Sequence, residues 1–353
     1  MENISRRKTC GYMNESRSDT FKRKRKRRVF FILLLGILAI ITPILWDAYS
    51  NIDRSLENIH NSISTNDKRE GSQAVIDATD PISIAFLGVD NGAYGRGNEA
   101  GRSDAIIVGT INPVTKKTTL VSIPRDTYAL MEGYETMDGS LFYDKLTHAY
   151  AFGEAEMAVN SIQELINVPI DYYVEVNMQG LMDIVDAIGG IEVTSPLTFD
   201  YEENYFVEGE TYSLNGTEAL AFARMRKTDP EGDFGRQKRE KLVIEAIIDK
   251  VLSFDSIMNY QSILQTMEKN VKTNLTFDEI TDLLSGYRGA MENIAQENLV
   301  GEELWIDDIY YLYVNPEDRL ELSNKLREEL ELDPIVMEDL ELSETDLYYV
   351  SPY

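Results

Sequence analysis

An unbroken run of 18 uncharged, mostly apolar residues near the N-terminus, residues 29–46, constrains this chain more than any other feature. A helix of this length rises 1.5 Å per residue and is just long enough to cross the hydrocarbon core of a bilayer. Seven consecutive basic residues, 22–28, precede it, and a basic flank of this kind stays in the cytoplasm. We therefore expect a cytoplasmic tail over residues 1–28, a transmembrane helix over 29–46, and an extracellular remainder.

The apolar run is not followed by a small-x-small cleavage motif, and aromatic residues stand at both of its ends, as they do at membrane interfaces. This pattern favours an uncleaved, single-pass signal anchor in the cell membrane over a signal peptide that is removed. Two alternatives are a buried core helix and a nucleic-acid patch formed by the basic run. The basic flank argues against the first. A tail of 28 residues is too short for a folded DNA-binding module, so we expect no nucleic acid partner.

Charge divides the chain sharply. Residues 1–28 hold 11 basic and 3 acidic side chains, whereas the whole chain has a net charge of −27. The exported part is therefore strongly acidic and repels polyanions over most of its surface. The single cysteine, Cys10, lies in the tail, so the exported part contains no disulfide. We expect a juxtamembrane stalk over 47–79, a catalytic domain over 80–331, and a frayed acidic tail over 332–353.

Beyond the stalk, short β-branched segments alternate with helical patterns, which predicts an α/β fold: a three-layer α/β/α sandwich with a central mixed sheet. The expected strands are 82–87, 105–111, 118–123, 171–176 and 191–194, with a late strand at 309–314. The expected helices are 154–166, 180–187, 217–223, 234–252, 256–269, 277–291 and 316–330.

Arginines are concentrated where such a fold binds ligands. Of the twelve arginines after the apolar run, seven lie in short segments at strand ends or helix starts, the usual place of the crevice in an α/β sheet. The guanidinium fork matches phosphate oxygens, so phosphate or pyrophosphate is the natural ligand. The alternative is that each arginine pairs with a surface carboxylate. The seven are Arg96, Arg102, Arg125, Arg224, Arg226, Arg236 and Arg239.

Two carboxylates stand at neighbouring strand ends. Asp90 follows the first expected strand, and Asp104 opens the second. Carboxylates so placed can hold one Mg²⁺, with phosphate oxygens and waters completing the octahedron. The alternative reading makes both of them turn residues. After the third strand, Pro124 ends the strand and Arg125 projects from its edge.

In the second half of the chain, the end of one expected helix and the start of the next carry the remaining arginines. Asn215 and Glu218 predict a capping box. The helix that begins there must end near residue 223 if Arg224 and Arg226 are to grip one ligand, because residues two apart diverge on a helix. Asp233 is expected as the N-cap of the next helix, which carries Arg236 and Arg239 on one face and makes an anion site.

Eight segments in this order resemble the LytR-CpsA-Psr family, and the resemblance extends over residues 81–252. The segments are LGVD, RSD, SIPRDTY, KLTHAYAFG, IDYYVEV, VDAIGGIEV, LNGTEALAFARMRK and GDFGRQKRE. The resemblance implies a Mg²⁺-dependent phosphotransferase that moves a glycopolymer, such as wall teichoic acid or capsule, from a polyprenyl-pyrophosphate carrier to peptidoglycan.

It further implies that Asp90 and Asp104 bind the ion, and that arginines hold the pyrophosphate: Arg102, Arg125, Arg224, Arg226 and Arg236. We add Arg239 to this group, expect Arg102 and Arg125 to act in catalysis, and choose Asp233 to assist the proton of the attacking hydroxyl. One position departs from the family: Glu240 stands where the family usually has glutamine.

The carrier's acyl chain needs an apolar slot, for which two helices offer candidates, although core packing explains the same pattern. The candidates are Met157, Ile162, Leu165, Ile166, Leu181, Ile184 and Val185. Two other functions stay open: a membrane-bound transcriptional attenuator and a non-catalytic receptor for lipid-linked polymer.

Overall fold

The computed structural model describes residues 60–65, 68–69, 74–91, 101–252, 270–343 and 345–346. Within these ranges no helix is both long and apolar enough to span a membrane. The apolar run 29–46 lies outside them, as does the helix expected over 256–269, so both stay predictions.

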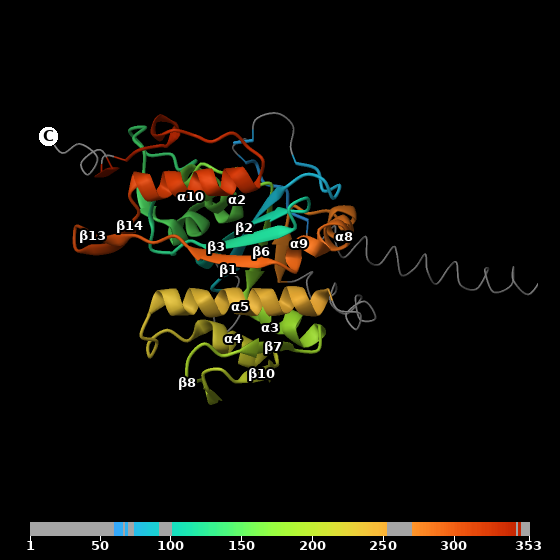
Figure 1. Ribbon diagram of the computed structural model, residues 1–353. Helices are drawn as coiled ribbons and strands as arrows, with labels where there is room; N and C mark the ends of the chain where they lie inside the picture. The colour runs from blue at the N-terminus through green and yellow to red at the C-terminus, as the bar shows by residue number, and fades with distance from the viewer. Residues whose placement is uncertain are drawn as a thin grey trace, which may run out of the picture. The chain divides into compact units, whose positions relative to one another are not determined.

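The described elements alternate between strands and helices, as expected (Figure 1). The strands are β1 (Ile82–Val89), β2 (Ser103–Asn112), β3 (Lys117–Ser122), β4 (Tyr128–Leu130), β5 (Tyr143–Lys145), β6 (Tyr172–Asn177), β7 (Ile191–Thr194), β8 (Phe199–Tyr201), β9 (Asn204–Phe206), β10 (Thr211–Leu214), β11 (Val271–Thr273), β12 (Ile294–Asn298), β13 (Glu302–Ile306) and β14 (Ile309–Tyr313). The helices are α2 (Leu146–Ile166), α3 (Met178–Ala187), α4 (Gly216–Arg224), α5 (Asp233–Val251), α8 (Phe277–Gly286), α9 (Arg288–Met291) and α10 (Pro316–Glu329), with a short 3-10 turn, η1 (Met337–Asp339).

The central sheet has six described strands in the order β11-β6-β1-β2-β3-β12. β1 runs parallel to β6 and antiparallel to β2, while β3 runs antiparallel to β2 and parallel to β12. The prediction of a mixed sheet is therefore confirmed. This topology brings the C-terminal ends of β1, β3, β6 and β12 to the same edge as the N-terminal end of β2.

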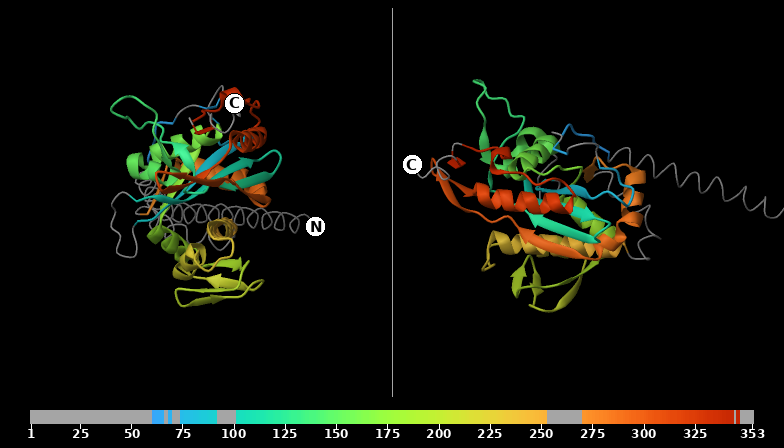
Figure 2. Two further views of the ribbon diagram at one scale, coloured as in Figure 1. Left: turned by 90° about the vertical axis from the view of Figure 1, so that its left-hand side faces the viewer. Right: turned by 45° about the horizontal axis from the view of Figure 1, so that its top comes forward.

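Helices cover both faces of the sheet, which gives the three expected layers (Figure 2). Residues of β1 alternate between the faces, as the period of a strand requires. Leu87 and Val89 join the core beneath α2 and α10, and Ile82 and Ile84 join the core beneath α8 and α9. Both clusters are buried, and they fix the strand ends rigidly in place.

A smaller β unit lies on the far side of α5 from the sheet (Figures 1 and 2). Here β7 pairs with β10, and β8 pairs with β9. The expectation that 191–194 belongs to the central sheet is therefore wrong. The alternation of Ile191 and Val193 marks a strand without marking its partner, and both side chains pack against α4 and α5 instead.

Two helices differ from their expected bounds. α2 begins at Leu146, eight residues earlier than predicted, and is kinked where Gly153 and Glu154 leave helical geometry. The helix expected over 277–291 is divided at Tyr287 into α8 and α9. A capping box formed by Asn215 and Glu218 starts α4, as predicted.

The end of the chain is packed as far as the structure describes it. Leu340, Ser343 and Asp346 are buried, and Asp346 pairs with Arg319 of α10 at 3.3 Å. The expectation of a frayed tail from residue 332 is wrong over this stretch, because buried Arg319 of α10 requires a carboxylate that the tail supplies.

Candidate active site

The site is built on the edge where β1, β2 and β3 meet. Gly88 is opposite Ala105 and Val89 is opposite Ser103, which leaves Asp104 as the extra residue of a β-bulge. A bulge bends its strand and re-aims the extra side chain, and bulges are frequent beside active sites. Asp90 lies just past β1, and its Oδ1 accepts the backbone N–H of Arg102 at 2.7 Å. The two predicted metal carboxylates thus lie at adjacent strand ends.

Arg125 reaches Asp104 from the end of β3. Its Nη1 lies 3.0 Å from Oδ1 of Asp104, and its Nε lies 3.7 Å from Oδ2 of Asp126. The Nε is buried and makes no hydrogen bond. Lys145 also pairs with Asp126, at 2.9 Å, and Thr147 donates its hydroxyl to Asp104 at 3.4 Å. Sequence reasoning missed Lys145 and Thr147, although both lie in the segment KLTHAYAFG.

The start of α5 completes the group from the other side. Arg236 donates from Nη1 to the backbone carbonyl of Asp104 at 3.1 Å, and from Nη2 to Asp233 at 3.1 Å. Nε of Arg226 lies 3.3 Å from Asp233. Arg125, Asp104, Arg236, Asp233 and Arg226 therefore form one continuous series of contacts that joins the sheet edge to the α4–α5 segment.

Asp233 lies one position away from where it was predicted. Gly232 is the N-cap of α5, with a φ of 58°, and the side chain of Asp233 accepts hydrogen bonds from the side chains of Arg236 and Gln237. Burial raises the pKa of Asp233, but Arg236, the amide of Gln237 and Arg226 outweigh burial and hold it below its ordinary value. A carboxylate with a lowered pKa is a weak base, so these contacts favour a role in holding the arginines.

Glu240 faces the same group one turn further along α5. It is largely buried and pairs with Arg236. Burial raises its pKa to about 7, against the opposing effect of Arg236 and with the support of Asp233 and Asp104. Its Oε2 makes no hydrogen bond. The carboxylate at this unusual position is thus directed at the site and not at solvent.

The remaining predicted arginines are placed differently. Arg102 is exposed at the start of β2, beside Asp90. Arg224 is the last residue of α4 and pairs with Glu202 of the β8–β9 turn at 3.4 Å. Met225 is extended, with ψ of 133°, so the helix ends where the shared-ligand argument requires it to end. Arg96 lies outside the described residues.

Arg239 was grouped with the ligand arginines, but its described contacts are all internal. The side chain is 1% exposed. Its Nε donates to the carbonyl of Phe222 at 3.0 Å, its other nitrogens contact the carbonyl of Met225 and the carboxylate of Asp229, and it lies over the ring of Phe199. These partners are the orphan carbonyls at the end of α4 and a buried carboxylate. Arg239 therefore holds α4 to α5.

Buried polar atoms without a hydrogen-bond partner gather at this edge. Such atoms are rare in native proteins and often mark an absent ion or ligand. Five of those found among the described residues belong here: Ser103 Oγ, Ser122 Oγ, Arg125 Nε, Gln237 Oε1 and Glu240 Oε2.

The residues present fit a magnesium ion. Mg²⁺ is usually held by one or two carboxylates, with substrate phosphates and waters as the other ligands, and Asp90 and Asp104 supply that set. Gly101 lets the chain pass close to the first carboxylate, because a Cβ there would lie 2.7 Å from Cγ1 of Val89 and 3.2 Å from Oδ1 of Asp90. No cluster of three or more histidine, cysteine or acidic residues suited to a metal occurs in the part of the chain that the structure describes. An all-protein metal cage is not needed for this type of site.

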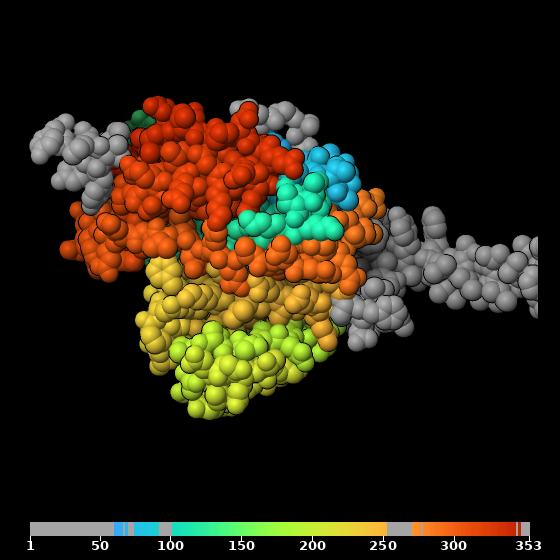
Figure 3. Space-filling view, in the orientation of Figure 1, coloured from blue at the N-terminus to red at the C-terminus, as the bar shows by residue number. Residues whose placement is uncertain are grey.

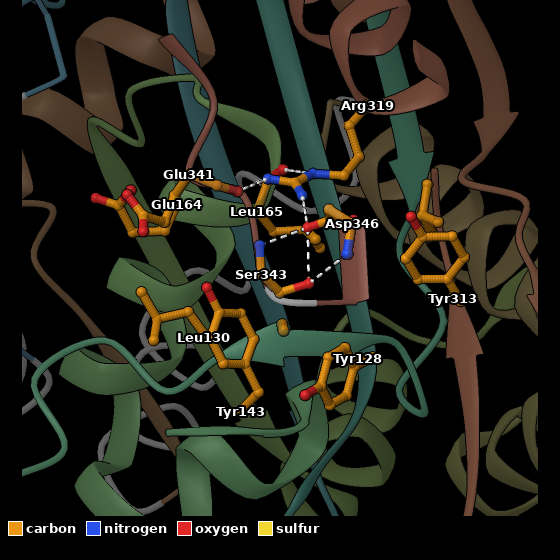
Figure 4. A pocket seen from close by; sticks show the side chains of 12 residues that line it. Tyr128, Leu130, Tyr143, Glu164, Leu165, Tyr313, Arg319, Glu341, Ser343 and Asp346 are labelled. Carbon is orange, nitrogen blue, oxygen red and sulfur yellow. Dashed lines mark hydrogen bonds and ion pairs between the residues drawn. The ribbon is translucent and has the colours of Figure 1, made fainter. Parts of the chain in front are cut away.

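A small pocket lies elsewhere, between β4, β5, α2, β14 and the end of the chain (Figure 4). Its arginine is Arg319, which donates to the carbonyls of Leu165 and Glu341 as well as pairing with Asp346. All three partners lie within the fold, so this pocket is a packing feature separate from the site. The expected acyl slot is not formed as predicted, because Ile162 and Val185 belong to different core clusters.

Comparison with known proteins identifies relatives over most of the chain. A model of the LytR_cpsA_psr family matches residues 47–328. A protein of Bacillus cereus named polyisoprenyl-teichoic acid–peptidoglycan teichoic acid transferase TagU is 41% identical over 312 residues, which cover 87% of this chain and 99% of the relative.

Solved structures agree in fold. An Enterococcus faecalis protein described as a transcriptional regulator is 41% identical, with a TM-score of 0.66, over 78% of this chain and 96% of the other. A structure of TagT bound to LI-WTA is 28% identical, with a TM-score of 0.63, over 77% of this chain and 100% of the other.

Proposed function

Since the chain belongs to the LytR-CpsA-Psr family, we propose that it transfers a glycopolymer of the teichoic acid class from a polyprenyl-pyrophosphate carrier to peptidoglycan. One observation carries this proposal: Arg125, Arg226 and Arg236 converge with Asp104 and Asp233 on one sheet edge. The Bacillus cereus relative is named as a transferase of teichoic acid from a polyisoprenyl carrier to peptidoglycan, which supports the proposal.

The chemistry follows from the charges. An acceptor hydroxyl of peptidoglycan attacks the phosphorus that carries the polymer and a new P–O bond forms. The P–O bond to the lipid phosphate breaks, the lipid phosphate leaves with the bonding electrons, and the hydroxyl proton passes to water. Arginines accelerate such a step by neutralising the oxygens that gain charge, and one well-placed arginine contributes roughly 10³ to 10⁵ in rate. Arg125 and Arg226 pair with Asp104 and Asp233, and these contacts hold the two guanidinium groups in place.

Asp90 and Asp104 would hold the magnesium ion that the family implies. The ion supplies further charge neutralisation on the pyrophosphate oxygens. The proposal predicts that a chelator abolishes transfer and that added Mg²⁺ restores it. If a chelator leaves the activity unchanged, the reaction does not depend on a metal ion, and only the proposed role of the arginines stands.

The same proposal places the described domain outside the cytoplasm, held by residues 29–46. A reporter fused after Tyr353 is expected to be active only outside the cytoplasm, and the mature protein is expected to keep its N-terminal residues. Recovery of a soluble secreted form that begins near Asp47 would overturn the anchor.

The experiment that tests the function is polymer transfer by the purified full chain. Arg125→Ala and Arg236→Ala are expected to lose transfer by at least about 10³-fold. Arg288→Ala is the matched control, because Arg288 is exposed and, among the described residues, forms an ion pair with Glu292 at the end of its own helix. Arg319 and Arg327 also lie outside the family motifs, but both are buried, so neither is used as a control. Equal activity in all three variants would overturn the proposal.

A second candidate is a membrane-bound transcriptional attenuator, because the Enterococcus faecalis relative is described as a transcriptional regulator. Such a function must act through the cytoplasmic tail. Deletion of residues 2–20, which keeps the basic flank and the apolar run, should leave transfer unchanged and would abolish regulation.

A further inference from the structure

The hairpin formed by β13 and β14 carries an aromatic surface that the proposed chemistry does not use. Trp305 and Tyr310 are directly opposite each other in the hairpin register, so their side chains project to the same face. Their rings form an edge-to-face pair with centroids 5.6 Å apart. Trp305 is 61% exposed, which is unusual for so large an apolar ring.

This aromatic pair is fixed beside the active site. The backbone N–H of Leu312, two residues from Tyr310, donates to the carbonyl of Asp126 at 2.8 Å, and Asp126 is the neighbour of Arg125. The Nζ of Lys145, which pairs with Asp126, lies 5.7 Å from the centroid of the Tyr310 ring. Figures 1 and 3 show the hairpin on the side at which α5 begins.

The hydroxyl of Tyr310 lies within electrostatic reach of the arginine group. Burial raises the pKa of its hydroxyl, and the carboxylates of Asp126, Glu303 and Asp233 raise it further, while Arg226 opposes them. Asp233 and Arg226 are members of the contact series described above. The Trp305–Tyr310 pair therefore borders the arginine group on the Tyr310 side, through Lys145 and Asp126.

The surroundings of Trp305 decide which chemistry it suits. Four carboxylates flank it on the hairpin: Glu302, Glu303, Asp307 and Asp308. They repel an anionic lipid surface or a polyanionic polymer. A neutral sugar chain fits both features, because the C–H faces of pyranose rings stack on aromatic rings while sugar hydroxyls donate to carboxylates.

We propose that Trp305 and Tyr310 form a binding platform for the glycan strand of the acceptor, which orients an acceptor hydroxyl toward the arginine-held phosphate. This inference rests on the proposed function and names where its second substrate binds.

The test separates acceptor binding from donor binding in the full chain. Trp305→Ala is expected to raise the KM for glycan acceptor about tenfold, with donor binding unchanged, since one stacking contact is worth about this factor. Trp305→Phe is expected to recover most of the loss. Tyr134→Ala, which removes another exposed aromatic ring on a different hairpin, is the control. If Trp305→Ala and Tyr134→Ala have the same acceptor KM, the platform is excluded.

A fluorescence measurement identifies the occupant. The chain has two tryptophans, so Trp46→Phe leaves Trp305 as the only tryptophan, which is excited selectively at the long-wavelength edge where tyrosine does not absorb. We expect a saturable shift of its emission on addition of a β-1,4-linked N-acetylglucosamine pentamer. Quenching by brominated lipids in phosphatidylglycerol vesicles, without a response to the sugar, would make the hairpin a membrane contact and overturn the inference. Donor binding that survives Arg125→Ala would instead overturn the proposed function, so the two failures are distinguishable.

Discussion

Glu240 stands where the family resemblance implies a glutamine, and its buried environment opposes its charge. Burial raises its pKa from an ordinary value of 4.5 to about 7. Because the folded pKa lies above the unfolded one, the folded state binds the proton more tightly between these two values. Glu240 therefore lowers the free energy of unfolding little at low pH, and it lowers it more as the pH rises from 4.5 through 7.

Glu240→Gln should relieve this effect. The gain in the free energy of unfolding should be larger at pH 8 than at pH 5, by on the order of 1–3 kcal/mol. Chemical denaturation at the two pH values measures it, with the exposed Glu292→Gln as the control. A gain that does not change with pH would show that Glu240 keeps its ordinary pKa in the fold.

The sequence placed several candidate residues together but not their partners. Motif spacing and strand ends grouped Asp90, Asp104, Arg125 and Arg236 at one edge, where the structure also has them, while their roles stay predictions. Arg239 could not be separated from Arg236, because both lie on one helix face at a spacing of three residues. What distinguishes them is the position of the α4 carbonyls, and that depends on a contact between two helices which no local pattern records.

At the scale of elements, the joint between α4 and α5 depends on Arg239. Its Nε donates to Phe222 and its guanidinium contacts Asp229, and the side chains of both arginine and aspartate are almost fully buried. Loss of one partner from such a pair leaves an uncompensated buried charge.

Arg239→Met should lower the free energy of unfolding by about 3–5 kcal/mol, as measured by urea denaturation, whereas Arg288→Met should have little effect. A variant that unfolds like the wild type but fails to bind pyrophosphate would return Arg239 to the ligand group.

Strands were easier to predict than their partners. The expected bounds of β1, β2, β3 and β6 are correct to within two residues, because these strands are β-branched and buried on both faces. β7 carries the same pattern over four residues, which was not enough to show that it pairs with β10. β13 was missed, since its sequence EELWI mixes two carboxylates with an exposed tryptophan.

At the scale of the whole described domain, the last described residues, 340–343 and 345–346, hold the end of the chain against α10 and form what we call the brace. Asp346 accepts the backbone N–H of Ser343 at 2.7 Å and pairs with Arg319, while Leu340 is 5% exposed. The acidic composition of the tail predicted a frayed segment. Composition alone does not show that one of its carboxylates, Asp346, pairs with buried Arg319.

Truncation after Glu331 should therefore lower the melting temperature by several degrees, since about 1 kcal/mol shifts it by roughly 2–4 °C in a domain of this size. Asp346→Ala should reproduce much of the loss, and Glu338→Ala, on the exposed 3-10 turn, should not. An unchanged melting temperature in the truncated chain would mean that the brace contributes nothing.

The central claim is that arginines from both halves of the chain hold one pyrophosphate at the edge of the sheet. The most direct measurement is the affinity of the full chain for polyprenyl pyrophosphate, with Arg125→Ala and Arg226→Ala compared with Arg288→Ala. We predict that each of the first two variants binds at least about tenfold more weakly, as expected for the loss of a charge-assisted contact of 1.5–3 kcal/mol, and that the control binds like the wild type. Equal affinity in all three variants would contradict the account.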